Sequence, residues 1–178
     1  MLNPMERSTI KQEINMSEEL MARINELLSH YPADKKKSAL LPVLHAVQDA
    51  HDHWLSVELM DKVAEILEIQ PIEVYEVVTF YTMYAQKPRG KYPLEFCRTS
   101  CCMLRGAEDM MDYTCQKLGV KENEVTPDGM FSVHGVECLG ACGYAPMLQL
   151  GDFNHEHLTK EKIDQLIEDC RAGKIELV

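Results

Sequence analysis

The residues with the clearest chemical potential are five cysteines that fall in two short stretches of the sequence. The stretch "FCRTSCCMLRG" contains Cys97, Cys101 and Cys102, and "ECLGACG" contains Cys138 and Cys142. Thiols at this density can form a disulfide, a zinc site, a catalytic redox pair or an iron–sulfur cluster. What the protein does depends on which of these four the sequence supports.

Three of the four alternatives fit the sequence poorly. The chain has seven cysteines, an odd number, and its N-terminal sequence has no secretory signal, so we expect a reducing cytosol and no disulfide framework. A thioredoxin-type redox pair needs a Cys-x-x-Cys unit, and the sequence has none. A structural zinc site usually takes its thiolates from the same tight unit.

The wider spacing of these cysteines favours a [2Fe–2S] cluster. Each of its two irons needs two thiolates, so the four sulfurs spread over a longer rhomb than around one zinc ion. The units Cys97-x4-Cys102 and Cys138-x3-Cys142 suit this requirement. Spacing alone leaves zinc or no metal open. It also leaves open whether Cys101 or Cys102 is the ligand, since adjacent cysteines cannot both bind comfortably.

The residues beside these cysteines are small or basic. Gly140 and Gly143 allow backbone N–H groups to turn toward sulfur, and a helix is expected after Cys102, with its N-terminal amides near the negative cluster. Arg98 and Arg105 could add positive charge, although a solvent-facing role suits each equally well.

The remaining cysteines and the paired histidines have ordinary structural interpretations. Cys115 and Cys170 lie on or near the apolar faces of expected helices, where a free cysteine is usually part of the core. The His-x-His pairs at 51–53 and 155–157 have no further ligands nearby in the sequence, so we expect them to be polar loop residues.

The first half of the chain reads as helices. Its apolar residues recur at i, i+3, i+4 and i+7, and serines or prolines stand where helices would start. We expect helices over about 17–31, 38–52, 56–67 and 71–86. The segment "TFYTMYAQ" (79–86) would be apolar on nearly all sides of its helix. It would then pack against the second half of the chain or dock onto another subunit.

The second half has a different pattern. "KPRGKYP" (87–93) breaks the helical spacing, and strands and helices alternate after it. The order is β–α–β–β–α, with one further possible strand at 120–126, which indicates a small α/β layer. Each cysteine group follows the end of a strand, so two neighbouring loops at one end of a sheet would bring four sulfurs together.

These patterns predict an α+β protein of three parts. Residues 1–16 form an N-terminal tail, residues 17–90 a helical bundle suited to partner docking, and residues 91–178 the cysteine-bearing α/β domain. The formal net charge of −11 argues against nucleic-acid binding, which requires a basic surface. No apolar run approaches the roughly 20 residues that span a bilayer, so we expect no membrane insertion.

Beyond the cysteines, longer stretches resemble a known family. "CMLRG" and "VECLGACGYAPM", together with "ALLPVLHAVQDAH" (39–51) and "EVYEVVTFYTMY" (73–84), resemble the small, 24 kDa-type [2Fe–2S] subunit of NADH:quinone oxidoreductase, respiratory complex I. The resemblance covers roughly residues 17–170. It implies a helical segment followed by a thioredoxin-like [2Fe–2S] ferredoxin domain. Its pattern implies one cluster bound by Cys97, Cys102, Cys138 and Cys142, with Cys101 outside the ligand set.

The resemblance also implies partners and a mechanism. A neighbouring subunit would bind FMN and NADH, further iron–sulfur subunits would follow, and this chain would exchange single electrons with the flavin. It would need no catalytic acid or base of its own, and it would lie in the cytoplasm, peripheral to the inner membrane through the complex. Alternatives are the equivalent subunit of an NAD-linked hydrogenase or formate dehydrogenase, or a mainly structural subunit.

Overall fold

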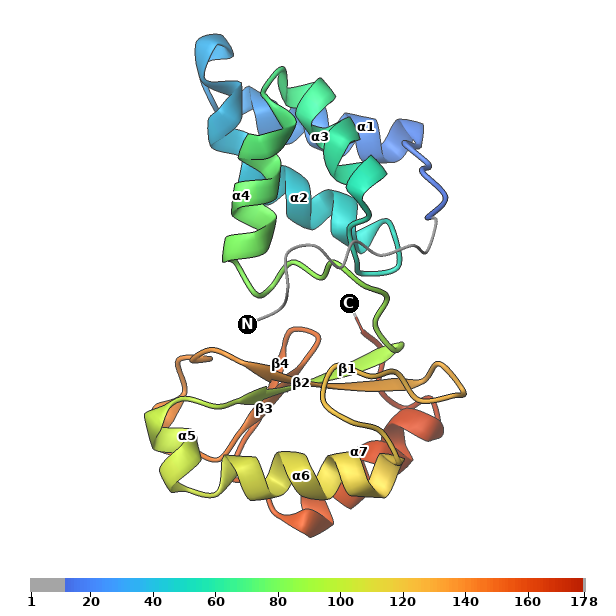
Figure 1. The fold of residues 1–178 in the computed structure, drawn as a ribbon, viewed down its shortest axis with the longest axis vertical. Coiled ribbons are helices and arrows are strands. Elements are labelled where there is room, and N and C mark those ends of the chain that lie inside the picture. Colours follow the sequence, from blue (N-terminus) through green and yellow to red (C-terminus); the bar gives the residue numbers. More distant parts are fainter. Residues whose placement is uncertain (1–11, 178) are drawn as a thin grey trace. The chain divides into compact units, whose positions relative to one another are not determined.

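The computed structural model describes residues 12–177, and the chain forms two compact units, Met1–Pro88 and Arg89–Val178. The first unit is helical and the second contains the sheet (Figure 1). The α+β class is therefore confirmed. Most of the predicted N-terminal tail (1–16) lies outside the described residues. Within those residues, no helix is long and apolar enough to cross a membrane.

The N-terminal unit buries the apolar faces of its helices in one core. Its elements are α1 (Glu18–Ser29), the 3-10 helix η1 (Ala33–Ala39), α2 (Leu40–Asp49), α3 (Val57–Leu67) and α4 (Pro71–Phe80). Local signals in the sequence set three of the starts, as predicted. The hydroxyl groups of Ser17 and Ser56 accept the backbone N–H groups of Leu20 and Leu59, and Pro71 occupies the first turn of α4.

The second predicted helix, 38–52, is wrong at both ends. A 3-10 helix precedes it, and α2 itself ends at Asp49. Asp52 and His53 adopt positive φ values of 55° and 58°, which a right-handed helix cannot accommodate.

The predicted helix over 79–86 is also wrong, because α4 ends at Phe80. Beyond it, the side chain of Gln48 binds the backbone: its Nε2 donates to Met83 O (3.2 Å), and its Oε1 accepts from Ala85 N–H (2.8 Å). Ala85 O in turn accepts from Leu55 N–H at 2.7 Å. These partners replace the helical hydrogen bonds and turn the Tyr84 ring into the core, where it is 3% exposed.

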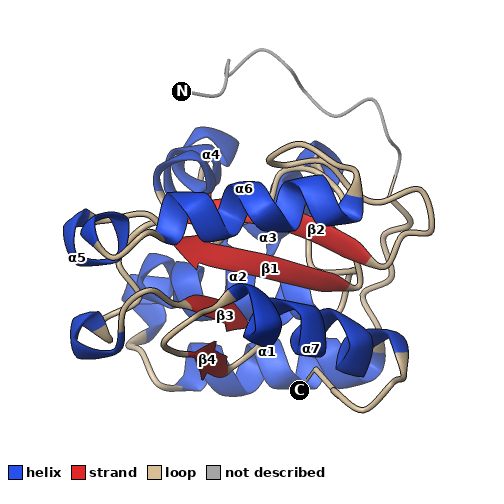
Figure 2. Cartoon of the chain, turned by 90° about the horizontal axis from the view of Figure 1, so that it is seen from below, coloured by secondary structure: helices blue, strands red, loops and turns tan. Residues whose placement is uncertain are grey.

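The C-terminal unit is a four-stranded mixed sheet with helices on one face. Its elements are β1 (Tyr92–Cys97), α5 (Ser100–Leu104), α6 (Ala107–Leu118), β2 (Phe131–Val136), the 3-10 helix η2 (Cys142–Tyr144), β3 (Leu148–Leu150), β4 (Phe153–His155) and α7 (Lys160–Arg171). The strand order is β2-β1-β3-β4; β1 and β2 are parallel, and the other pairs are antiparallel. Both α6 and α7 cover the same face of the sheet (Figures 1 and 2).

The order of elements agrees with the predicted β–α–β–β–α layer, with one addition. The strand expected before the tight turn near residue 151 is β3. A further short strand, β4, follows the turn and pairs with β3 as a hairpin. The possible strand at 120–126 is reduced to one isolated bridge between Val125 and Ser132.

The core of this unit lies between the sheet and its helices. Alternate residues of β1, Tyr92, Leu94 and Phe96, are buried, as a strand with one face on the core requires. Cys170 on α7 is 1% exposed and belongs to this core, as predicted, and burial raises its pKa to about 11. Cys115 is partly buried against the same core.

Candidate metal centre

Both cysteine groups lie at one end of the parallel strand pair. In the register of β1 and β2, Cys97 is paired with Val136, and each residue is the last of its strand. Figure 2 shows these strands side by side, with α5 just beyond the end of β1. The loops that carry the two cysteine groups therefore start next to each other, as the sequence predicted.

Within these loops, four thiols form two neighbouring pairs. The sulfur atoms of Cys138 and Cys142 lie 3.8 Å apart, and two thiolates bound tetrahedrally at about 2.3 Å to one ion would also lie about 3.8 Å apart. Cys97 and Cys102 form the other pair: both are buried, and both belong to the same small apolar cluster.

This arrangement provides the two pairs of thiols that a dinuclear cluster needs, because a [2Fe–2S] cluster takes two thiolates at each of two irons. The residues present therefore suit the cluster that the sequence predicted.

The two pairs differ in exposure. Cys97 and Cys102 are 2% and 1% exposed and pack in a small apolar cluster with Met147. Cys138 and Cys142 are exposed. Cys101 is also exposed, whereas its neighbour Cys102 is buried. The two adjacent cysteines thus have different surroundings.

Hydrogen bonds to sulfur favour the thiolate form at two positions. Burial by itself raises the pKa of Cys97, but hydrogen bonds from the side chain and backbone of Thr99 and from the Leu139 N–H outweigh it, and the net pKa is lowered. The pKa of Cys138 is lowered mainly by the Gly140 N–H. At Cys102, burial dominates and raises the pKa to about 11. The protein thus supplies donors that can stabilise thiolate ligands.

Gly140 meets the conformational requirement that its sequence position suggested. Its φ is +81°, in the left-handed region, and its N–H turns toward the Cys138 sulfur. The other predicted neighbours behave differently. The Arg98 guanidinium pairs with Glu122 at 2.9 Å, and Cys102 lies inside the five-residue α5 rather than before it.

The loop that carries Cys138 and Cys142 is held from the C-terminal side. His157 N–H donates to Tyr144 O (2.8 Å), and the His157 and Tyr144 rings meet edge to face with centroids 5.7 Å apart. Leu158 N–H donates to Pro146 O at 2.9 Å. His157 therefore has a packing role, and His155 is half-buried with its pKa lowered by burial.

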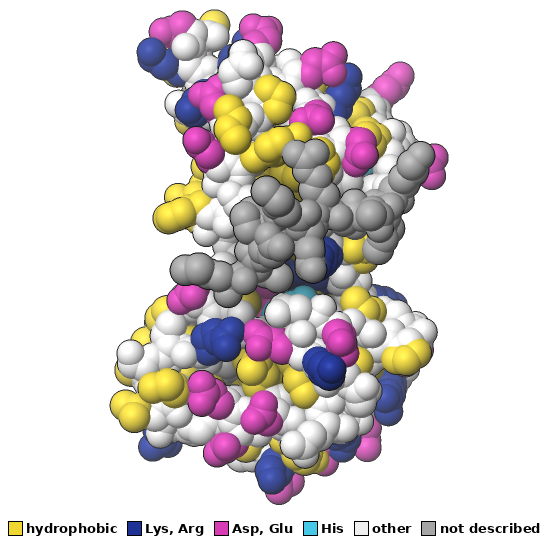
Figure 3. Space-filling model, viewed as in Figure 1, with side chains coloured by type: hydrophobic (Ala, Val, Ile, Leu, Met, Phe, Trp, Pro, Cys, Tyr) yellow, Lys and Arg dark blue, Asp and Glu magenta, His cyan; other side chains and the backbone are white. Residues whose placement is uncertain are grey.

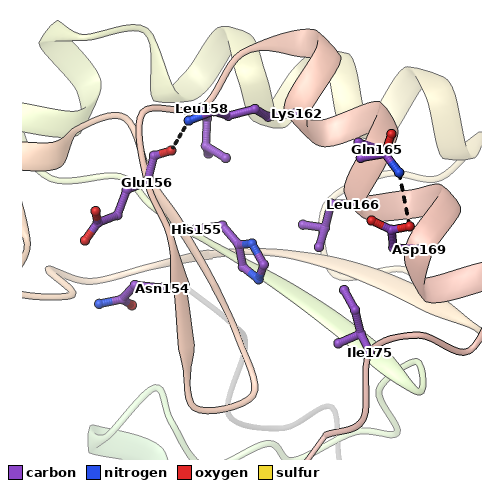
Figure 4. A pocket seen from close by; sticks show the side chains of 9 residues that line it. All are labelled: Asn154, His155, Glu156, Leu158, Lys162, Gln165, Leu166, Asp169 and Ile175. Atoms are coloured by element: carbon purple, nitrogen blue, oxygen red, sulfur yellow. Dashed lines mark hydrogen bonds between the residues drawn. The ribbon is translucent and has the colours of Figure 1, made fainter.

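A hollow of about 370 Å³ lies beside β4 and α7 (Figure 4). Its polar groups bind one another: Lys162 donates to the Glu156 carbonyl (3.0 Å), and Gln165 donates to Asp169 (3.0 Å). The hollow has no cysteine in its lining, so it is separate from the centre. On the face seen in Figure 3, acidic and basic side chains of the C-terminal unit are interspersed.

Sequence reasoning overlooked Thr99, which lies between two of the predicted ligands. Its hydroxyl oxygen is 3.4 Å from the Cys97 sulfur. The only hint in the sequence is a hydroxyl residue two positions after a candidate ligand, which is too common a pattern to single out.

Comparisons with known proteins agree with this geometry. A family model described as "Thioredoxin-like [2Fe-2S] ferredoxin" matches residues 24–171. The E subunit of the NADH-quinone oxidoreductase of Rickettsia bellii is 43% identical over 146 residues, which is 82% of this chain and 87% of that protein. NADH-quinone oxidoreductase subunit 2 of Thermus thermophilus is 40% identical over 152 residues, 85% of this chain and 83% of that protein.

A solved structure shares the fold. The crystal structure of an NAD+-reducing [NiFe]-hydrogenase in the air-oxidized state aligns with a TM-score of 0.64 at 21% identity. The alignment covers 75% of this chain and only 23% of the hydrogenase chain, so this likeness concerns the fold alone. Together with the family match over most of the sequence, it confirms the expected thioredoxin-like domain, and the chain belongs to the thioredoxin-like [2Fe–2S] ferredoxin family.

Proposed function

We propose that this chain is an electron-transfer subunit of an NADH-quinone oxidoreductase. It would hold one [2Fe–2S] cluster on Cys97, Cys102, Cys138 and Cys142, and it would exchange single electrons with FMN on a neighbouring subunit. The observation that carries the proposal is the pairing of four thiols at the ends of two parallel strands. Identities of 40% and 43% to subunits of this complex support it.

The residues of this chain contribute ligation, electrostatics and placement. When bound, a [2Fe–2S] cluster accepts and releases one electron at a time, whereas NADH gives up two as a hydride. The backbone N–H groups of Leu139 and Gly140 stabilise negative charge on sulfur. The buried pair, Cys97 and Cys102, would anchor the cluster, and the exposed pair, Cys138 and Cys142, would face the redox partner.

The helical unit offers a docking surface for the flavin-binding subunit. At the end of α4, the Phe80 side chain is 76% exposed, and Tyr81 and Met83 are each 39% exposed. Large apolar side chains grouped in this way are typical of protein interfaces. Such docking, with further iron–sulfur subunits beyond, would hold the chain on the cytoplasmic side of the inner membrane without a segment of its own entering the bilayer.

The ligand set can be tested with two adjacent substitutions. We expect purified Cys101→Ser to keep its visible cluster absorption, iron and acid-labile sulfide, and Cys102→Ser to lose them, because only Cys102 lies buried against Cys97. The opposite result would exchange the roles of the two residues. A wild-type chain that contained zinc instead of iron would refute the cluster itself.

The redox role is tested in the assembled complex with Cys138→Ser, and Cys115→Ser serves as a control outside the centre. We expect Cys138→Ser to abolish the electron paramagnetic resonance signal of the reduced [2Fe–2S] cluster after NADH addition. We expect the control to keep this signal. If Cys138→Ser assembles and leaves NADH oxidation, quinone reduction and oxygen side reactions unchanged, the structural alternative is correct.

A hydrogenase or formate dehydrogenase subunit is the second candidate. The observation in its favour is the fold shared with the NAD+-reducing hydrogenase, at 21% identity. The higher identity to quinone-oxidoreductase subunits favours the first proposal. Co-purification of the tagged chain from its own cells separates the two, because the isolated complex would carry either quinone-reductase or hydrogenase activity.

A further inference from the structure

The side chain of Thr99 does not do what its position in the fold would lead one to expect. Thr99 is the N-cap residue of α5, with φ −87° and ψ 169°, and a threonine at such a position usually accepts a backbone N–H from the first turn. Thr159, at the N-cap of α7, does so and accepts Lys162 N–H. Thr99 makes no such bond. Its hydroxyl is therefore available for another partner.

That partner is sulfur. The Thr99 Oγ1 lies 3.4 Å from the Cys97 Sγ. Cys97 is one of the two buried thiols of the centre, so the hydroxyl reaches a proposed ligand directly. A thiolate that binds metal has no proton to donate. In the loaded centre the Thr99 hydroxyl must consequently be the donor, and sulfur the acceptor.

We propose that Thr99 is a positioning residue that sets the reduction potential of the centre, by donating its hydroxyl proton to the ligand sulfur of Cys97. This inference rests on the proposed function. Reduction adds one electron, part of whose charge falls on the ligand sulfurs, so a donor to sulfur stabilises the reduced form more than the oxidised form. The Thr99 hydroxyl therefore raises the potential.

The experiment compares variants of the full-length chain purified with its cluster. Thr99→Val keeps the shape and removes the hydroxyl, Thr99→Ala removes the hydroxyl and the methyl group, and Thr99→Ser restores the hydroxyl. Ser100→Ala is the matched control, because Ser100 is the exposed next residue and the structure records no hydrogen bond from it to sulfur. The midpoint potential is measured by a redox titration followed by electron paramagnetic resonance, with iron and sulfide content as a check on loading.

We expect Thr99→Val and Thr99→Ala to raise the ratio of oxidised to reduced cluster at a fixed potential about threefold or more. For a one-electron couple, this change lowers the midpoint potential by about 28 mV or more. Thr99→Ser and Ser100→Ala should stay near the wild-type value. A residue that only supported the loop would alter loading without this pattern in the potential.

Two results would overturn the inference. The first is that Thr99→Val or Thr99→Ala loads its cluster and still has the wild-type midpoint potential. The second is failure of both of these variants to load while Thr99→Ser behaves normally, which would assign the hydroxyl to assembly instead. Neither result bears on the proposed function, which is tested separately by the cluster content of the wild-type chain, by Cys138→Ser and by the activity of the isolated complex.

Discussion

Acidification from about pH 7.5 to about pH 5 should destabilise the C-terminal unit through one buried histidine, His134 on β2. Its ring is 9% exposed and is bound on both sides: Nδ1 lies 2.9 Å from Asn123 Oδ1, and Nε2 lies 2.8 Å from Ser132 Oγ. Gly90 N–H donates to the same Ser132 oxygen, so the Ser132 proton is free to point to Nε2. This network suits a neutral ring with its proton on Nδ1.

The magnitude follows from the pKa of His134. Burial, with a smaller contribution from the positive charge of Arg89, lowers it from 6.5 to about 4. Because the unfolded chain binds the proton at higher pH than the folded chain, stability is lost as the pH falls from about 6.5 to about 4. By linkage, the loss between pH 7.5 and pH 5 amounts to about 2 kcal/mol.

The assay compares urea unfolding of the reduced, cluster-free wild type and of His134→Gln at both pH values. Pulse labelling by hydrogen exchange reports on peptides from β1 and β2, and fluorescence of the buried Trp54 reports on the helical unit. We expect the stability difference between the two proteins to change by about 2 kcal/mol in the sheet peptides. The Trp54 transition should be the same in both proteins.

All other titrating groups are common to the two proteins, so their contributions cancel in this comparison. Parallel stability curves for wild type and His134→Gln would therefore refute the reasoning. They would show that the folded unit accepts a proton on His134 at little cost, either by rotating Ser132 or by admitting water.

Two further predictions use matched pairs of substitutions. Gly140→Ala should strain the cysteine loop by about 1–2 kcal/mol, because φ is +81° at this position. The added Cβ meets no atom within 4 Å, so the strain comes from the backbone and not from a clash. Loss of the cluster to an iron chelator should then be faster by a factor of about 5–30. Gly143→Ala, where the backbone is not left-handed, should be near wild type. Phe80→Ser should weaken binding to the flavin-binding subunit at least about tenfold, measured by calorimetry, since about 1.5–3 kcal/mol of apolar burial is lost. Phe153→Ser is the control: it makes the same change at a side chain that is 58% exposed in the other unit, and it should leave binding unchanged. An equal loss of affinity in both variants would contradict the assigned docking surface.

The features that sequence predicted well are those set by nearby residues. The helix starts at Ser17, Ser56 and Pro71 depend on groups within the first turn, so the sequence pattern contains the whole cause. The end of α4 was missed because distant residues decide it. At α4, the side chain of Gln48 and the N–H of Leu55 capture the backbone of residues 83–85, and no local pattern could reveal this.

In the candidate centre, too, the sequence predicted some features and missed others. Strand periodicity places Cys97 and the loop before Cys138 at one end of the sheet, and the structure brings them together there. The direction of individual side chains depends on loop geometry, which spacing does not fix. This is why Thr99 was overlooked, although its chain position was plain.

The choice between Cys101 and Cys102 also depends on the direction of side chains and not on spacing. Both cysteines have a similar spacing from Cys97, and the x3 unit in the second loop does not decide between them, so the sequence pattern does not distinguish them. Once α5 forms, however, successive side chains rotate by about 100° around the helix, so the two neighbours cannot face the same way. The structure turns Cys102 into the apolar cluster beside Cys97 and Cys101 toward solvent. Formation of one short helical turn thus supplies the asymmetry that the proposed ligand set requires.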